Sequence, residues 1–246
     1  MKVFFEHIGR IFQMVRGGLK RPENQKVYWI ELMDQCISLG IGSLPIVLVI
    51  SLFMGMVMTV QFNYLIISPI VSKTVIGSLV RDSSVLEFCP TITNIVLAGV
   101  IGSKISSELG NMRLSEQIDA LEIMGINTRA YLVIPKILAC VFMIPCLIII
   151  SIAVSIWGGY LASMYSPVMT SAQFSAGVVV GFHPYDLVYS MVKTFTFSLF
   201  ISIIPSYFGY YLKGGAIEIG RAATKSVVLT CIMILCADYI LSILFL

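Results

Sequence analysis

Long stretches without a charged residue constrain this chain more than any other feature. Asp, Glu, Lys and Arg are all absent between Gln35 and Ser72 and again between Ile137 and Tyr185. Apolar residues make up 58% of the 246 residues and charged residues only 12%, whereas soluble domains carry about 25% charged residues. Because about 20 apolar helical residues cross a bilayer, the sequence predicts an all-α integral membrane protein. A disordered chain is excluded by the same composition.

Five segments are long and apolar enough to be transmembrane helices. We predict a single domain over residues 1–246, with spans at 41–66, 86–107, 136–162, 187–211 and 226–246. The second span contains Thr91, Thr93 and Asn94, so we expect it to face protein or a cavity rather than lipid. The piece at 171–182 is too short to cross a bilayer and predicts an interfacial or re-entrant helix.

The N-terminal segment 1–22 has the pattern of a basic amphipathic helix. Apolar residues recur there at helical spacing, at Phe4, Ile8, Ile11, Val15 and Leu19. Polar residues interrupt the segment too often for a signal peptide. We therefore predict a helix that lies in the membrane interface, with packing on the chain's own cytosolic surface as the alternative.

The distribution of basic residues predicts the orientation. Thirteen of the sixteen Lys and Arg residues lie in the first 26 residues and in the loops 104–136 and 213–225. With five spans these regions share one side of the membrane, which the positive-inside rule assigns to the cytoplasm. The N-terminus is then cytoplasmic and the C-terminus external.

No enzyme signature accompanies these spans. His7 and His183 are far apart in the sequence, and the metalloprotease, nucleophile-elbow and phosphate-loop motifs are absent. A net charge of +3 without interleaved basic and aromatic residues argues against nucleic acid. The six cysteines form no C-x-x-C pair, and we expect them to be free and buried. We predict a chain without a catalytic site, without a bound metal and without a cofactor of its own.

Two predicted cytosolic loops carry candidate partner contacts. Segment 113–125 has the pattern of a short amphipathic helix, which Ser115 can cap and Gly125 can end. Such a helix suits docking of a soluble partner, and a plain surface helix is the alternative. Its candidate docking residues are Glu116, Gln117, Ile118, Asp119, Leu121 and Gly125. The second loop is rich in glycine, with Gly215, Gly220 and Arg221 as a second cytosolic motif or a flexible connector.

Three separated motifs resemble the MlaE/YrbE-type ABC transporter permease family. The first is Phe53, Gly55-Met56-Val57 and Gln61. The second is Ala98-Gly99, Gly102-Ser103, Glu108-Leu109-Gly110, Met112, Glu116 to Leu121, Met124-Gly125 and Pro135. The third is Gly214-Gly215, Gly220-Arg221-Ala222, Thr224, Val227-Val228 and Asp238. The resemblance covers the chain in order from about residue 40 onward.

The resemblance implies a function and a set of partners. Permeases of this family are homodimers in the bacterial inner membrane that move phospholipids between the inner and outer membranes. Each dimer works with cytosolic ATPase subunits, which hold ATP and Mg²⁺, and with periplasmic MCE-domain proteins. A STAS-type accessory subunit is left open. Segment 113–125 would be the coupling helix on the ATPase. The family's arginine and glycine near the start of span 2 are missing from Leu86-Glu87-Phe88-Cys89-Pro90.

A phospholipid site needs an apolar wall and a few polar groups at one end. Glu87 and Lys193 lie at the outer ends of two predicted spans, and we expect them to lie near each other because ionisable groups at membrane depth usually pair. Met58, Gln61, Leu65 and Ile66 lie on roughly one face of span 1 and are the candidate apolar wall. A structural ion pair and ordinary helix packing are the alternatives.

Two other functions compete with this prediction. A secondary transporter driven by an ion gradient would show inverted repeats and several intramembrane carboxylates, whereas only Glu87 and Asp238 are candidates here. A membrane scaffold that transports nothing would not need a cavity that lipid can enter.

Overall fold

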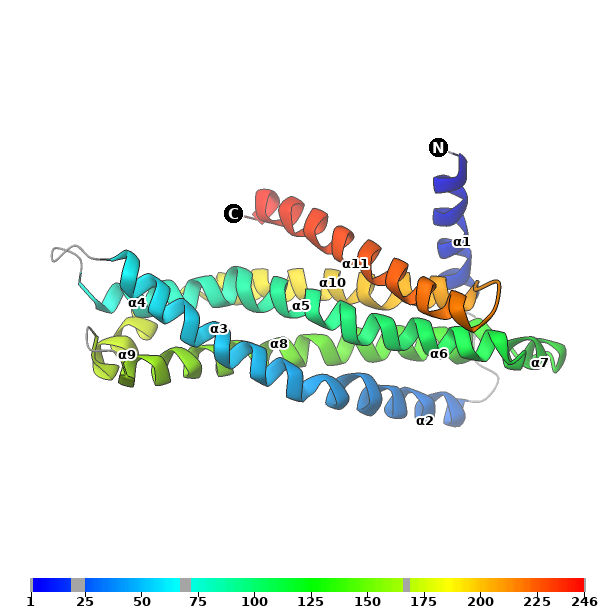
Figure 1. Cartoon of the computed structure of the whole chain (residues 1–246), viewed down its shortest axis with the longest axis horizontal. Coiled ribbons are helices and arrows are strands. Elements are labelled where there is room, and N and C mark those ends of the chain that lie inside the picture. The colour runs from blue at the N-terminus through cyan, green and yellow to red at the C-terminus, as the bar shows by residue number, and fades with distance from the viewer. Residues whose placement is uncertain (1, 19–24, 67–71, 166–168, 246) are drawn as a thin grey trace. The chain divides into compact units, whose positions relative to one another are not determined.

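The structure is a computed structural model that describes residues 2–18, 25–66, 72–165 and 169–245 (Figure 1). All regular elements in these ranges are helices. The α-helices are α1 (Lys2–Gly18), α2 (Gln25–Gln35), α3 (Leu44–Leu65), α4 (Thr74–Ser83), α5 (Thr93–Leu97), α6 (Ser103–Leu114), α7 (Gln117–Ile123), α8 (Ile134–Tyr165), α9 (Ser171–Val179), α10 (Pro184–Tyr210) and α11 (Ala216–Phe245). Wider π-helical turns form η1 (Cys36–Gly40), η3 (Ser84–Ile92), η4 (Ala98–Gly102) and η5 (Arg129–Val133), and η2 (Ile41–Ser43) is a 3₁₀ turn.

Five helical stretches in the described ranges are long and apolar enough to cross a membrane, which confirms the predicted fold class. They are Lys26–Leu65, Thr74–Leu114, Arg129–Tyr165, Pro184–Tyr210 and Ala216–Phe245. Several exceed the predicted spans, and the second extends past 86–107 at both ends. A helix of about 40 residues is roughly 60 Å long, about twice the hydrocarbon thickness. Hydropathy therefore marks only the apolar part of each helix. Residues 1, 19–22 and 246 of the predicted segments lie outside the described residues.

The chain forms two compact units, which we describe separately. Unit 1 comprises Met1–Ser43, Ile95–Met143 and Phe197–Ala237. Unit 2 comprises Leu44–Asn94, Ile144–Thr196 and Asp238–Leu246. Helices α5, α8, α10 and α11 contribute residues to both units.

Unit 2 is built on close backbone contact between α3 and α8. A Cβ atom on Gly55 would collide with the carbonyl of Ser155, and one on Gly158 would collide with the carbonyl of Leu52. The hydroxyls of Ser51 and Ser151 lie 2.7 Å apart across the same helix pair. Small residues allow helices in a membrane to approach this closely, and hydroxyl pairs add hydrogen bonds between them.

A second pair of helices in unit 2, α4 and α9, lies side by side (Figure 1). The pair meets at Gly77 and Gly177, each against the backbone of the other helix. The buried guanidinium of Arg81 donates to the carbonyls of Val178, Val180 and Gly181 at 2.7–3.0 Å. Arg81 therefore satisfies the carbonyls that α9 leaves without partners at its C-terminal end. Helix α9 also accounts for the predicted short helix at 171–182.

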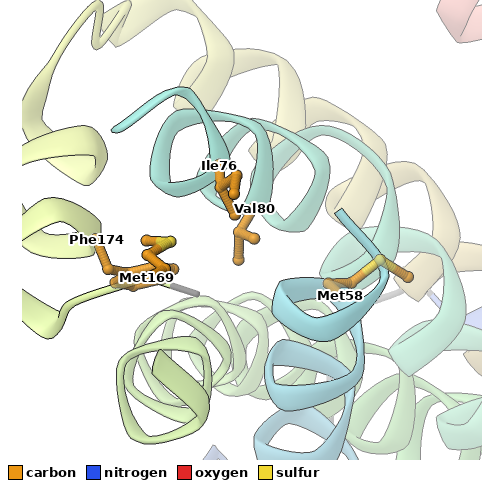
Figure 2. Close-up of a cluster of buried hydrophobic side chains, with 5 residues drawn as sticks. All are labelled: Met58, Ile76, Val80, Met169 and Phe174. Carbon is orange, nitrogen blue, oxygen red and sulfur yellow. The ribbon is translucent and has the colours of Figure 1, made fainter. Parts of the chain in front are cut away.

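Side chains from α3, α4, α9 and the segment just before α9 meet in an apolar cluster within unit 2 (Figure 2). Its buried members are Met58, Ile76, Val80, Met169 and Phe174. Ile66 and Phe62, at the end of α3, pack against this cluster.

Unit 1 packs α6 against the end of α10 and the start of α11. Gly209 on α10 contacts the backbone of Ser106, and Gly110 on α6 faces Leu212 and Ile219. The buried ammonium of Lys136 lies 2.7 Å from the carboxylate of Glu108, so a charge inside this unit has a partner of opposite sign.

The π-helical turns change the direction of side chains along the second membrane-spanning stretch. Segment η3 contains Pro90, which has no N–H group to donate to the preceding turn. A π turn takes one residue more than an α turn, and it accommodates the proline without ending the helix.

The six cysteines are free, as we predicted, but they are not all buried. Cys89 and Cys140 are buried, whereas Cys146 and Cys236 are exposed on their helices. A thiol is apolar enough to face either protein or lipid, so the expectation of burial was too narrow.

We predict that Gly55→Ala destabilises the protein. The added methyl group meets the Ser155 carbonyl, and overpacking of this kind costs about 1–3 kcal/mol. The measurement is thermal unfolding of the purified chain in detergent micelles. Gly99→Ala is the matched control, because a Cβ atom at Gly99 meets no atom within 4 Å. Equal melting temperatures for the two variants would contradict the close α3–α8 contact.

Candidate functional site

A cluster of three charged side chains lies within unit 2. The ammonium nitrogen of Lys193 is 2.8 Å from Glu87 Oε1 and 2.7 Å from Asp238 Oδ1. The Lys193 side chain is fully buried, while Glu87 is 42% exposed and Asp238 is 17% exposed. Two carboxylates therefore surround one cation, and Glu87 is the member that a ligand can reach most easily.

Polar and aromatic neighbours also surround the ammonium group of Lys193. The ammonium group also donates to the Leu86 carbonyl at 3.3 Å and lies 4.7 Å from the centroid of the Tyr189 ring. Thr91 donates to Asp238 at 3.0 Å. A charge buried in an apolar unit needs this number of partners, because desolvation of an unpaired ion is costly.

The structure brings Glu87 and Lys193 together, as their positions in the spans predicted. The sequence identifies Asp238 as an acidic residue in the last span but does not assign it to this pair. The sequence nevertheless contained a signal for Asp238. Lys193 and Asp238 both lie within apolar runs, and charged groups in such runs usually pair. Thr91 was already expected to face protein or a cavity, whereas nothing in the sequence separates Tyr189 from ordinary helix residues.

The four candidate wall residues do not share one surface. Met58 is buried in the apolar cluster of Figure 2 and Ile66 packs against it. Gln61 and Leu65 are exposed instead. The prediction treated α3 as an isolated helix, but α4 and α9 cover part of the face that these residues occupy. Contact of Gln61 and Leu65 with a substrate stays a prediction.

The predicted cytosolic helix at 113–125 is divided in the structure. Helix α6 continues to Leu114, and α7 begins only at Gln117. Glu116 has a left-handed backbone (φ 58°) at the reversal between the two helices. Ser115 does not cap α7, because its hydroxyl donates to the Asn111 carbonyl of α6. Gly125, with φ 81°, follows the end of α7, where its left-handed conformation carries no steric cost.

The apolar residues of α7 differ in exposure from the predicted ridge. Ile118 is fully buried and Leu121 is half-buried, so Ile118 cannot contact a partner directly. The exposed apolar side chains are Ile123 and Met124, which are 87% and 66% exposed. Asp119 accepts from Arg113 at 2.6 Å, and Glu116 and Gln117 are exposed. The apolar surface that a partner can reach is therefore at the end of α7, while Glu116 and Gln117 offer exposed polar groups at its start.

The second cytosolic motif forms the start of α11. Gly215 precedes the helix, and Arg221 pairs with Glu218 at 2.6 Å. A shallow hollow of about 460 Å³ is lined by Ile217, Gly220, Arg221, Thr224 and Lys225. The hollow is open and basic. Within the described ranges, His, Cys, Asp and Glu residues do not gather in groups of three that could hold a metal ion.

We predict that Lys193→Met destabilises the protein strongly. Two carboxylates then lack their cation, and breaking a buried ion pair costs about 3–5 kcal/mol. The triple variant Lys193→Met, Glu87→Gln, Asp238→Asn removes all three charges and should recover most of the loss. Thermal unfolding in detergent micelles measures both effects. A triple variant that melts no higher than Lys193→Met would contradict the charge-pairing explanation.

Comparison with known proteins gives one consistent result. The model of the family described as permease MlaE matches residues 32–244. A probable ABC transporter permease protein of Rickettsia bellii is 34% identical over 89% of this chain and 84% of its own length. The intermembrane phospholipid transport system permease protein MlaE of Haemophilus influenzae is 30% identical over 97% of this chain and 92% of its own length.

A plant relative extends the comparison beyond bacteria. The chloroplastic protein TRIGALACTOSYLDIACYLGLYCEROL 1 of Arabidopsis thaliana is 32% identical over 88% of this chain and 62% of its own length. The family match spans most of the chain, including the three middle apolar stretches in full and most of the first and the last. The chain therefore belongs to the MlaE permease family.

Proposed function

We propose that this chain is the membrane subunit of an ABC transporter that moves phospholipids between the inner and outer membranes and so maintains the lipid asymmetry of the outer membrane. It acts as a homodimer in the bacterial inner membrane. The N-terminus is cytoplasmic and the C-terminus is periplasmic. The Haemophilus relative named for intermembrane phospholipid transport supports the substrate class, and the one-sided distribution of Lys and Arg supports the orientation.

The charge cluster of unit 2 is the single observation that carries the substrate proposal. A phospholipid has a charged headgroup and apolar chains, so its site combines a polar end with an apolar wall. Glu87, held by Lys193 and Asp238, provides an accessible polar group between apolar helices. Gln61 and Leu65, exposed on α3 of the same unit, offer contacts to the rest of the lipid.

The energy for transport comes from a separate cytosolic ATPase, which holds ATP and Mg²⁺. Helix α7 is the coupling helix, with exposed Ile123 and Met124 as its apolar contact. Relatives named as ABC transporter permeases support this assignment. The further partners are a periplasmic MCE-domain protein and, in some assemblies, a STAS-type subunit.

One observation favours a second candidate function. A lysine between two carboxylates within membrane-spanning helices is also an arrangement that ion-coupled transporters use. A secondary transporter driven by an ion gradient would need no ATPase. The two functions are separated by asking whether an ATPase accompanies the chain.

We predict that affinity purification of the tagged chain from gently solubilised native membranes recovers a P-loop ATPase, an MCE-domain protein and phospholipid. Mass spectrometry of proteins and lipids measures all three. Recovery of the chain without an ATPase, under conditions that keep other ABC complexes intact, would contradict the proposed function and favour the gradient-driven alternative.

We further predict that Ile123→Asp releases the ATPase. A charge at a docked apolar position leaves an ion without water or a partner, so recovery of the ATPase should fall at least tenfold. Val179→Asp is the matched control, because Val179 on α9 is also highly exposed and lies on the external side in the proposed orientation. Equal recovery of the ATPase with Ile123→Asp and with Val179→Asp would exclude α7 as the coupling helix.

A further inference from the structure

Three consecutive residues of unit 1, Asn127, Thr128 and Arg129, hold α1, α7 and the end of α10 together. They lie between α7 and α8, where the sequence analysis assigned no role. We propose that this junction, with Tyr210 of α10, passes movement of α7 jointly to α1 and α10 during transport. The coupling part of the proposal rests on the proposed function, while the physical link can be tested in the chain alone.

Thr128 connects α7 to α10. Its buried hydroxyl lies 3.1 Å from Glu122 Oε1 on α7 and 2.7 Å from the hydroxyl of Tyr210, the last residue of α10. Tyr210 in turn lies 2.9 Å from the same Glu122 oxygen. Thr128 and Tyr210 can each donate their one hydroxyl hydrogen to this carboxylate oxygen, or one of them can donate to the other hydroxyl, so two of the three contacts are hydrogen bonds at any moment. The three side chains form a closed triangle that fixes α7 against the end of α10.

Asn127 and Arg129 connect the same segment to α1. The Asn127 amide donates to the Gly17 carbonyl at 2.9 Å, and Arg129 reaches the Gln13 carbonyl at 3.4 Å. The Gly17 carbonyl belongs to the last turn of α1, where the helix has no later N–H group to bond it. The Gln13 carbonyl lies one turn earlier, and Arg129 adds a second donor to it. Gly17 packs on Arg129, and Gly18 lies against Ile134. The C-terminal part of α1 is therefore bound to the residues that follow α7.

Besides filling space as buried side chains, Thr128 and Tyr210 supply hydrogen bonds to this junction. Ile118 already buries the inner face of α7, and the triangle adds a directional contact through one carboxylate. Hydrogen bonds between buried hydroxyls have preferred directions. A network of such bonds therefore favours two discrete arrangements of the helices over a gradual sliding of one helix along another. Thr128 and Tyr210 are accordingly positioning residues for coupling rather than residues that contact the substrate.

The first test uses hydrogen exchange of the purified chain in detergent micelles. Thr128→Val has nearly the same shape but no hydroxyl, and we expect exchange in α7 to rise about tenfold, the effect of losing about one buried hydrogen bond. Thr128→Ser retains the hydroxyl and should exchange like the wild type. Asn127→Asp removes the donor to Gly17 but keeps the acceptor for the Ala130 N–H, so exchange should rise in α1.

Two exchange results would overturn the physical link. Unchanged exchange of α7 in Thr128→Val would show that the triangle does not hold α7. Unchanged exchange of α1 in Asn127→Asp would show that the junction does not hold α1.

The second test measures coupling in the intact complex with its ATPase. The complex is reconstituted in vesicles of phosphatidylethanolamine and phosphatidylglycerol, and movement of a fluorescent phospholipid is recorded together with phosphate release. We expect Thr128→Val and Tyr210→Phe to reduce the lipid moved per ATP hydrolysed about tenfold, while the ATPase still copurifies. Thr128→Ser should restore the ratio. Tyr211→Phe, which removes a hydroxyl from the next ring, is the matched control.

The outcomes separate the junction from the proposed function. Absence of an ATPase from the wild-type preparation would overturn the proposed function and the coupling role, while the exchange results would still decide the physical link. A wild-type ratio of lipid to ATP in Thr128→Val would overturn the coupling role. An equal fall in transport and hydrolysis with loss of the ATPase would also overturn it, because the residues would then serve folding or docking alone.

Discussion

The absence of water in the bilayer is the constraint on which the rest of this structure depends. Every backbone polar group and every charge inside the hydrocarbon layer needs a partner within the protein. The backbone meets this need by helix formation, and many hydroxyls bond the carbonyl of the preceding turn. Ser51, Thr194 and Thr230 donate in this way to Val47, Ser190 and Ser226. The same need explains why Arg81 is directed at free carbonyls and why Lys193 sits between two carboxylates.

Polar groups have different tasks in the two units. In unit 2, the hydroxyl pairs between Ser51 and Ser151 and between Ser84 and Ser155 join helices that small residues already bring close. In unit 1, the polar contacts gather around the loop that follows α7, where Thr128, Glu122 and Tyr210 share one network. The first arrangement favours a fixed framework. The second gathers interactions around a short helix whose far end exposes Ile123 and Met124 to a partner.

Much of the fold could be predicted from the sequence, because the charge-free runs report directly on the membrane. The approach of Glu87 to Lys193 also followed from the cost of an unpaired charge. Other features depend on tertiary contacts that periodicity does not contain. Met58 and Leu65 are seven residues apart and share one face on a helical wheel, yet α4 and α9 cover only the first. Ser115 has the side chain of a cap, but the chain reverses at Glu116 and directs the Ser115 hydroxyl back to α6. The third member of the charge cluster, Asp238, is distant in sequence and was not assigned to it.

The π-helical turns have a consequence for tracing descent within such a family. Each π turn in η3 and η4 holds one residue more than an α turn, so it is a place where a single codon can be gained or lost without breaking the helix. The change would rotate the following side chains relative to the preceding ones. A relative that lacks the extra residue near Pro90 could therefore keep the same amino acids around Glu87 while presenting different ones beyond Thr93. A gap in an alignment of these helices would then indicate that the side chains after the gap point in a different direction around the helix axis, and not simply that the helix is shorter.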